Sequence, residues 1–203
     1  MAVHAATVPA HRAPFEESMN RGMAGMVLFI CSEIMLFGAL FAGFFYLHQQ
    51  AGTWPPNGVE RFVKIEPLNV VLTILLLTSG VFAHFGLLGI KGGNRSQFKL
   101  GIALAIVLGT IFICGQSYEW LRFIKHDHFT VRSTVYGATF FIMTGFHGAH
   151  VIAGLLMLAV VEVRAFWNDF TPRRHLFADT AVLYWHFVDV VWVFLWVLVY
   201  ILA

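Results

Sequence analysis

Five long apolar runs follow one another along the chain, and polar residues are mostly confined to short segments between them. The runs cover residues 22–47, 67–90, 100–121, 133–163 and 178–203. Each is long enough for an α-helix to cross the hydrocarbon core of a bilayer, which takes about 20 residues. Apolar side chains occur all round each run, as in helices that face lipid or other helices. The pattern therefore predicts an all-α polytopic membrane protein, in which residues 21–203 form a bundle of five transmembrane helices.

Residues 1–20 are polar and are predicted to form an N-terminal tail. They do not resemble a signal peptide, because the apolar run that follows is too long and lacks a small-residue cleavage site.

The positive charges in the tail and the connections predict an orientation. One side of the membrane would hold Arg12, Arg21, Lys91, Arg95, Lys99, Arg164, Arg173 and Arg174. The other side would hold Arg61, Lys64, Arg122, Lys125 and Arg132. Since Lys and Arg accumulate in cytoplasmic loops, the N-terminus is predicted to be cytoplasmic and the C-terminus outside.

Composition supports a membrane protein and excludes several other classes. Hydrophobic residues make up 59% of the chain and charged residues 12%, against about 25% charged residues in soluble domains. A formal net charge of +2 offers no basic face for nucleic acid. Cys31 and Cys114 lie inside apolar runs and do not predict a disulfide framework. The sequence shows no nucleophile elbow, P-loop or zinc signature, so we expect neither a catalytic residue nor a metal site on this chain.

Ionisable residues inside the apolar runs are the candidate functional residues. Each costs about 2.5–3.5 kcal/mol at the centre of a membrane helix on insertion scales. The helical rise predicts that six of them share the inner half of the bundle: Glu33, His84, His147, His150, His186 and Asp189. Glu119 is predicted nearer the outer end of its helix.

Three interpretations of these residues remain open. They could hydrogen-bond to one another and to the backbone, with Glu33 donating to a histidine such as His147, and so fix helix packing. Glu33 could instead be a proton-active carboxyl group near a lipid or subunit boundary. The histidines could also ligate a haem or metal, although they lack the companions of a metal site.

Small residues at four-residue spacing predict close helix contacts. Gly145, Ala149 and Ala153 form one such stripe, and Ala39 with Gly43 forms a shorter one.

Several sequence stretches resemble one family in order and over the whole chain except the N-terminal tail. The stretches are Ser32-Glu33, Trp54-Pro55-Pro56, Pro67-Leu68-Asn69, Gln116 with Tyr118-Glu119, Tyr136 to Phe141, Thr144 to Val151, and Tyr184 to Trp192, which reads YWHFVDVVW. They are similar to subunit III of the haem–copper terminal oxidases, above all of cytochrome c oxidase.

The resemblance implies a non-redox subunit that binds phospholipid and supports proton uptake and sustained turnover in its neighbour. Glu33 would correspond to the family's carbodiimide-reactive carboxyl group. Arg164, Thr171 and His175 fall where the family contacts lipid head groups, with Arg173 and Arg174 nearby.

The implied partners are oxidase subunits I and II, with a small subunit IV or a larger respiratory supercomplex as further candidates. Haem and copper would belong to the catalytic partner, which reduces oxygen to water and pumps protons.

The chain departs from the family's long form, which has seven helices and a V-shaped lipid cleft between the first two and the last five. Five-helix forms of the family indicate a bacterial plasma membrane. Subunit III of a quinol oxidase is the nearest alternative, followed by a stand-alone b-type haem carrier or transport bundle.

Overall fold

The computed structural model describes residues 14–55, 66–125 and 128–202, with side chains from residue 21 onward. It contains helices α1 Pro14–Ala51, α2 Pro67–Lys91, α3 Arg95–Lys125, α4 Val135–Phe166 and α5 Leu176–Trp196, followed by a π-helical turn η1, Val197–Ile201. No strand occurs in this described part, so the all-α prediction is confirmed. The helices extend beyond some of the predicted apolar runs: α1 begins at Pro14 and α3 at Arg95. Residues 1–13 of the predicted tail lie outside the described residues.

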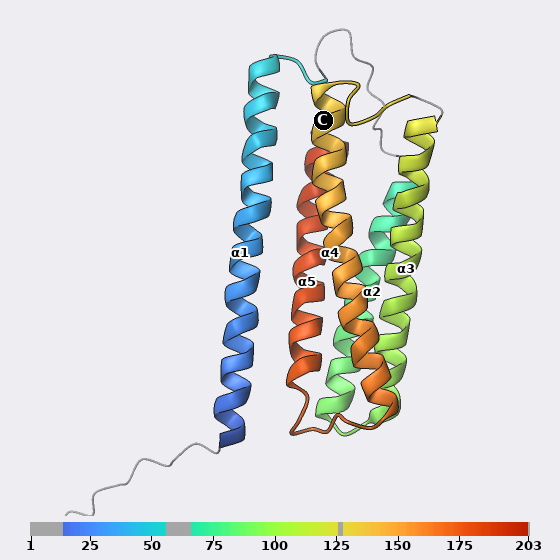
Figure 1. Cartoon of the computed structure of the whole chain (residues 1–203). Helices are drawn as coiled ribbons and strands as arrows, with labels where there is room; N and C mark the ends of the chain where they lie inside the picture. Colours follow the sequence, from blue (N-terminus) through green and yellow to red (C-terminus); the bar gives the residue numbers. More distant parts are fainter. Residues whose placement is uncertain (1–13, 56–65, 126–127, 203) are drawn as a thin grey trace, which may run out of the picture.

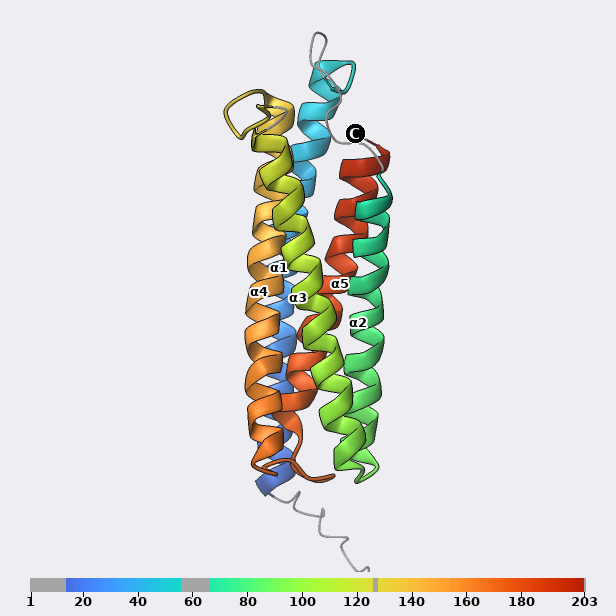
Figure 2. The ribbon, with the colours of Figure 1, turned by 90° about the vertical axis from the view of Figure 1, so that its right-hand side faces the viewer.

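The five helices run side by side along one axis, with α1 at the edge of the bundle (Figures 1 and 2). The start of α1 and the α2–α3 and α4–α5 connections lie at one end, which we call the N-terminal end. The C-terminus and the start of α4 lie at the opposite end. Helix α1 packs against α5 and, to a smaller extent, α4, whereas α2 and α3 form the most extensive helix contact.

Glycines bring α2 and α3 unusually close together. A Cβ atom on Gly86 would lie 3.0 Å from the carbonyl oxygen of Phe98, and one on Gly101 would lie 2.6 Å from the backbone nitrogen of Gly86. The connecting turn contains Gly93 at φ +82°, a left-handed conformation that glycine adopts readily. The side chain of Asn94 then accepts a hydrogen bond from the Gln97 backbone at 3.1 Å and caps α3.

The bundle core is built around two tryptophans of α5. Trp185 and Trp192 are fully buried. Their indole N–H groups donate to the hydroxyl oxygens of Ser79 and Thr73 on α2, each at 3.0 Å. Since an unpaired N–H inside a bilayer is costly, these bonds fix how α5 is rotated against α2.

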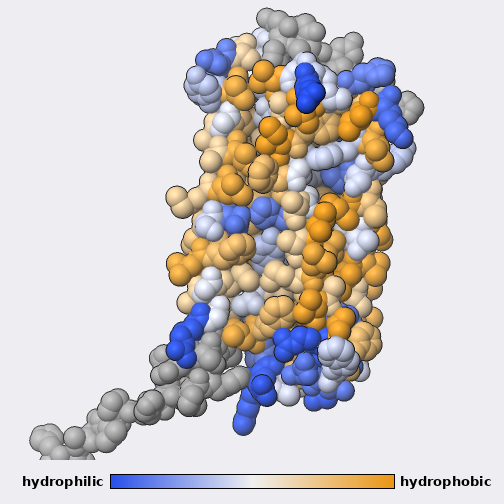
Figure 3. All heavy atoms as spheres, viewed as in Figure 1, coloured by the Kyte–Doolittle hydropathy of each residue, from blue (hydrophilic) through white to orange (hydrophobic). Residues whose placement is uncertain are grey.

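On the face seen in Figure 3 most of the surface is apolar, and hydrophilic residues gather at the ends and in a small patch at mid-height. Large exposed side chains include Leu28 and Met35 of α1, which are 72% and 77% exposed. Cys31 on α1 and Cys114 on α3 are exposed on this surface as free thiols. All five helices are long and apolar enough to cross a membrane. The molecule is therefore a membrane protein with five helices of spanning length in its described part.

Candidate functional site

Glu33 and His150 form a side-chain hydrogen bond between α1 and α4 at membrane depth. Oε2 of Glu33 lies 2.9 Å from Nε2 of His150, and the two side chains are only 17% and 14% exposed. The ring of Phe37 packs edge-on against His150 with centroids 4.9 Å apart, and Tyr184 of α5 donates to the His150 carbonyl at 3.4 Å. The structure therefore brings Glu33 to a histidine, as one interpretation of the sequence expected, but to His150 and not to His147, which was given as the example.

The two hydrogen-bond partners of His150 restrict which protonation states the Glu33–His150 pair can have. Its Nδ1 atom lies 2.7 Å from the carbonyl oxygen of Phe146, which can only accept a hydrogen bond, so Nδ1 carries a hydrogen. The bond to Glu33 then needs one proton between Nε2 and Oε2. Either the carboxyl group is neutral and donates, or a carboxylate accepts from a charged imidazole. Both arrangements have zero net charge, which burial in a membrane favours.

An apolar hollow of about 400 Å³ lies on the N-terminal side of this pair. It is an open hollow lined by Gly25 and Phe29 of α1, Met157 of α4, and Leu176 and Phe177 of α5, among others. The Glu33–His150 pair and the hollow thus both lie where α1 packs against the rest of the bundle.

His84, His186 and Asp189 form a second group, between α2 and α5. The two histidine rings lie 5.8 Å apart, and Nδ1 of His186 lies 3.8 Å from Oδ2 of Asp189. Gly80 makes room for this group, because a Cβ atom there would collide with the Asp189 carboxylate.

His147 belongs to neither group. It is 1% exposed, stacks on Trp192 with centroids 4.9 Å apart, and meets Phe112 edge-on. Neither ring nitrogen has a hydrogen-bond partner among the residues that the structure describes. The six ionisable residues that were predicted to share the inner half of the bundle therefore make three separate sets of contacts.

A buried cluster near the other end was not predicted from the sequence. The carboxylate of Glu119, 3% exposed, accepts from the Tyr200 hydroxyl at 2.7 Å and from the Gln116 amide at 3.1 Å. Tyr200 lies in the π-helical turn that follows α5. At the surface nearby, Arg122 forms two hydrogen bonds to Glu66, at 2.6 and 3.1 Å.

The residues predicted to bind lipid all lie at the N-terminal end, in or beside the α4–α5 connection. Thr171 and Arg174 exchange two backbone hydrogen bonds, and Arg173 is exposed. Arg164 lies 3.3 Å from Asp169 and stacks over Phe170 and Phe177. His175 lies 3.2 Å from Asp179, which also pairs with Lys91.

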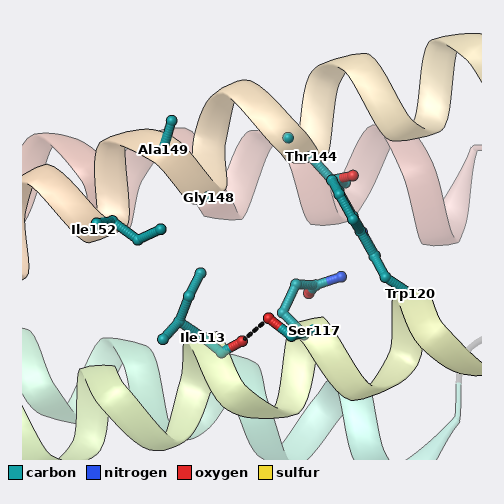
Figure 4. A pocket seen from close by; sticks show the side chains of 9 residues that line it. Ile113, Ser117, Trp120, Thr144, Gly148, Ala149 and Ile152 are labelled. Carbon is teal, nitrogen blue, oxygen red and sulfur yellow. Dashed lines mark hydrogen bonds between the residues drawn. The ribbon is translucent and has the colours of Figure 1, made fainter.

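The predicted stripe of small residues on α4 does not make a close helix contact. Ala149 and Ala153 are exposed, and Gly145, Gly148 and Ala149 line a hollow of about 270 Å³ between α3 and α4. Figure 4 shows Ile113, Ser117 and Trp120 of α3 on the opposite side of this hollow. Ala39 and Gly43 of α1 are exposed as well. These small residues therefore leave surface open instead of bringing backbones together.

No cluster of three or more His, Cys, Asp or Glu residues able to hold a metal ion occurs in segments 14–55, 66–125 and 128–202.

Comparison with known proteins identifies the family. The model of the family "Cytochrome c oxidase subunit III" matches residues 3–203. The chain belongs to the cytochrome c oxidase subunit III family. It is 39% identical over 184 residues to cytochrome c oxidase subunit 3 of Corynebacterium diphtheriae, covering 89% of this chain and 88% of that protein.

Relatives in eukaryotes are similarly close. Cytochrome c oxidase subunit 3 of Oryctolagus cuniculus is 38% identical over 206 residues, covering 98% of this chain and 75% of that protein. The protein of the same name in Prototheca wickerhamii is 40% identical over 181 residues, covering 87% of this chain and 67% of its own length. Membership of the haem–copper oxidase subunit III family implies a complex with other oxidase subunits.

The subunit III resemblance found in the sequence is thus confirmed, and the structure gives its strongest stretch a physical meaning. Within Tyr184 to Trp192, both tryptophans point into the bundle and bond to α2. His186 and Asp189 of the same stretch lie beside Gly80 instead. One short segment of this subunit III family member therefore supplies both core packing and a polar group at the side of the bundle.

Proposed function

We propose that this chain is the non-redox subunit III of a proton-translocating cytochrome c oxidase in a bacterial plasma membrane. The family match over residues 3–203 is the observation that carries the proposal. Haem and copper would reside on the catalytic subunit I, and cytochrome c would deliver electrons through subunit II. A small subunit IV, or a larger respiratory supercomplex, would be a further partner of the chain in addition to subunits I and II. The chain itself would contribute no catalytic centre.

In this proposal Glu33 and His150 support the oxidase by holding α1 in place. Their bond is supported by the 2.9 Å contact and by the net neutrality of the pair. Tyr184 and Phe37 hold the histidine from two further sides. Such a pair can stabilise packing, or a lipid next to it, without carrying charge through the membrane.

We further propose that a phospholipid binds at the N-terminal end of the bundle. Its head group would lie near Arg164, Thr171, Arg173, Arg174 and His175. Its acyl chain would enter the 400 Å³ hollow, whose wall includes Leu176 and Phe177, the residues directly after His175. Arginine binds phosphate through charge-assisted hydrogen bonds, and basic clusters beside a membrane helix attract anionic lipid.

The orientation proposed for this subunit is N-terminus in the cytoplasm and C-terminus outside. Lys91, Arg95, Lys99, Arg164, Arg173 and Arg174 lie toward the end that would face the cytoplasm, which is the side where positive residues accumulate.

Purification of the native complex in mild detergent, through an affinity tag on this chain, tests the proposal. We expect stoichiometric co-purification with subunits that carry haem and copper, and oxidation of reduced cytochrome c by the complex. Oxidation of quinol but not of cytochrome c would favour the quinol oxidase branch. Isolation of the chain alone, with a haem spectrum of its own, would contradict the proposal and favour a b-type haem carrier.

A further inference from the structure

The group between α2 and α5 lies on the side of the bundle and is only partly enclosed by this chain. We call Gly80, His84, His186 and Asp189 the α2–α5 polar patch. His84 is exposed, and the His186 side chain is 41% exposed. The patch therefore opens onto the surface that would otherwise face lipid.

The patch is deep in the membrane-spanning region. His186 and Asp189 lie 10 and 13 residues after Leu176, where α5 begins, or about 15 and 20 Å along the helix. A lipid head group does not reach this depth, and an acyl chain offers no hydrogen bond. Ionisable residues in such a position cost about 2.5–3.5 kcal/mol each unless other polar groups meet them.

One hydrogen-bonding atom of the patch is left unmatched. Oδ1 of Asp189 is buried without a partner among the described residues, while Oδ2 faces His186 at 3.8 Å. The Asp189 side chain is 8% exposed. Leaving a buried acceptor unpaired costs about 1–3 kcal/mol, more for a charged group. That atom is closed to a partner, so a group from outside the chain would meet the patch through the exposed rings of His84 and His186.

The surface around the patch is apolar and continues into a hollow. Val81 of α2 and Val190 of α5 are 67% and 55% exposed. Val190 also lines a hollow of about 310 Å³ between α5 and α1, together with Phe37 and Phe187. A polar centre with an apolar rim is how helices associate inside a membrane, where hydrogen bonds and close packing replace the hydrophobic effect.

We infer that a transmembrane helix of another oxidase subunit docks on the α2–α5 polar patch. It presents a hydroxyl, amide or carboxyl group that hydrogen-bonds to the exposed ring of His84 or His186, and its apolar side chains cover Val81 and Val190. This inference rests on the proposed function, because it takes the partner to be an oxidase subunit. It assigns the docking face to α2 and α5 and leaves the α3–α4 side to lipid.

Site-specific photo-crosslinking in the intact complex tests this assignment. Benzoylphenylalanine is placed at Val81, next to the patch, or at Leu156 of α4, which is 64% exposed and serves as the matched control. After irradiation, we expect Val81 to crosslink to another oxidase subunit at least about ten times more than Leu156. Adducts to lipid alone at Val81 would overturn the inference, as would an adduct between two copies of this chain.

A second variant tests the polar contact itself. His84→Leu is at an exposed position, so the fold of the chain should survive. We expect the variant chain to dissociate from the complex more readily in detergent. One lost interhelical hydrogen bond corresponds to about a three-fold to eighteen-fold change in retention. Retention equal to that of a Leu156→Ala control, together with no Val81 crosslink, would contradict the inference.

The two proposals fail in different ways. If no oxidase subunit co-purifies with the chain, the proposed function is wrong. If the oxidase co-purifies but crosslinks through Leu156 and not Val81, only the docking face is wrong.

Discussion

Helix α1 and the α2–α3 pair are held in the bundle by opposite means. In the α2–α3 pair, backbone meets backbone at Gly86 and Gly101, where no side chain intervenes. Helix α1 instead makes a few side-chain contacts: Phe37 and Phe44 are its buried large residues, and Glu33 bonds to His150. Hollows of about 400 and 310 Å³ lie along the α1 contact.

The difference shows that small residues alone do not predict helix contact in a membrane protein. Gly101 faces a glycine on the neighbouring helix, so the backbones approach. Gly43 of α1 has no atom of another helix within 4 Å of a built Cβ. Because lipid tails are as apolar as the side chains, helices associate through close packing and hydrogen bonds. We therefore expect substitutions in the α2–α3 contact to affect stability more than substitutions along α1.

The largest effect should come from Gly101→Leu. The new side chain would meet the backbone of Gly86 and Phe82, which cannot move without separating the helices. We expect a loss of about 3 kcal/mol or more, at the upper end for overpacking. Detergent-mediated unfolding followed by circular dichroism measures it. Gly43→Leu is the control and should change stability by less than about 0.5 kcal/mol. Equal losses of stability at Gly101 and Gly43 would contradict the proposed difference between the α2–α3 contact and α1.

A smaller effect is expected from the Glu33–His150 pair. Double-mutant cycles put interhelical hydrogen bonds in membranes at about 0.6 kcal/mol on average and about 1.7 at most. The cycle of Glu33→Ala, His150→Ala and the double variant should give a coupling free energy in that range.

Substitution of Glu33 should also affect how long the oxidase stays active. Glu33→Gln retains an N–H donor for Nε2 of His150, so assembly and early oxygen consumption should persist. Glu33→Ala should lose activity sooner over many turnovers, because His150 then lacks its partner. Immediate loss of oxygen reduction in Glu33→Gln would show direct participation in chemistry or proton supply.

The smallest effect on the stability of the fold is expected at the lipid site beside α1, where bound lipid should change instead. Arg173→Gln with Arg174→Gln should reduce co-purified anionic lipid, measured by mass spectrometry, since each charge contributes about 1 kcal/mol near a membrane surface. Lys125→Gln with Arg132→Gln removes equal charge at the opposite end and is the control. A similar lipid loss in both double variants would contradict a specific site.

The sequence predicts the helices well because each apolar run suffices to specify a spanning segment. It cannot predict helix rotation, which decides which residues meet. His147 and His150 are three residues apart, yet one stacks on Trp192 and the other bonds to Glu33. The contact between Glu119 and Tyr200 spans 81 residues and includes a π-helical turn, so no local pattern reveals it.

The two cysteines allow the difference in packing between α1 and the α2–α3 pair to be measured with the natural sequence. Cys31 belongs to the loosely packed helix and Cys114 to the tightly packed pair, and both thiols are exposed on the apolar surface. A lipid-soluble nitroxide reagent can label them without any engineered position. Pulsed electron paramagnetic resonance would then measure the distribution of distances between the two nitroxide labels. The width of that distribution reports how far α1 moves relative to α3. The natural sequence thus already contains the two sites needed to follow that motion as the complex assembles.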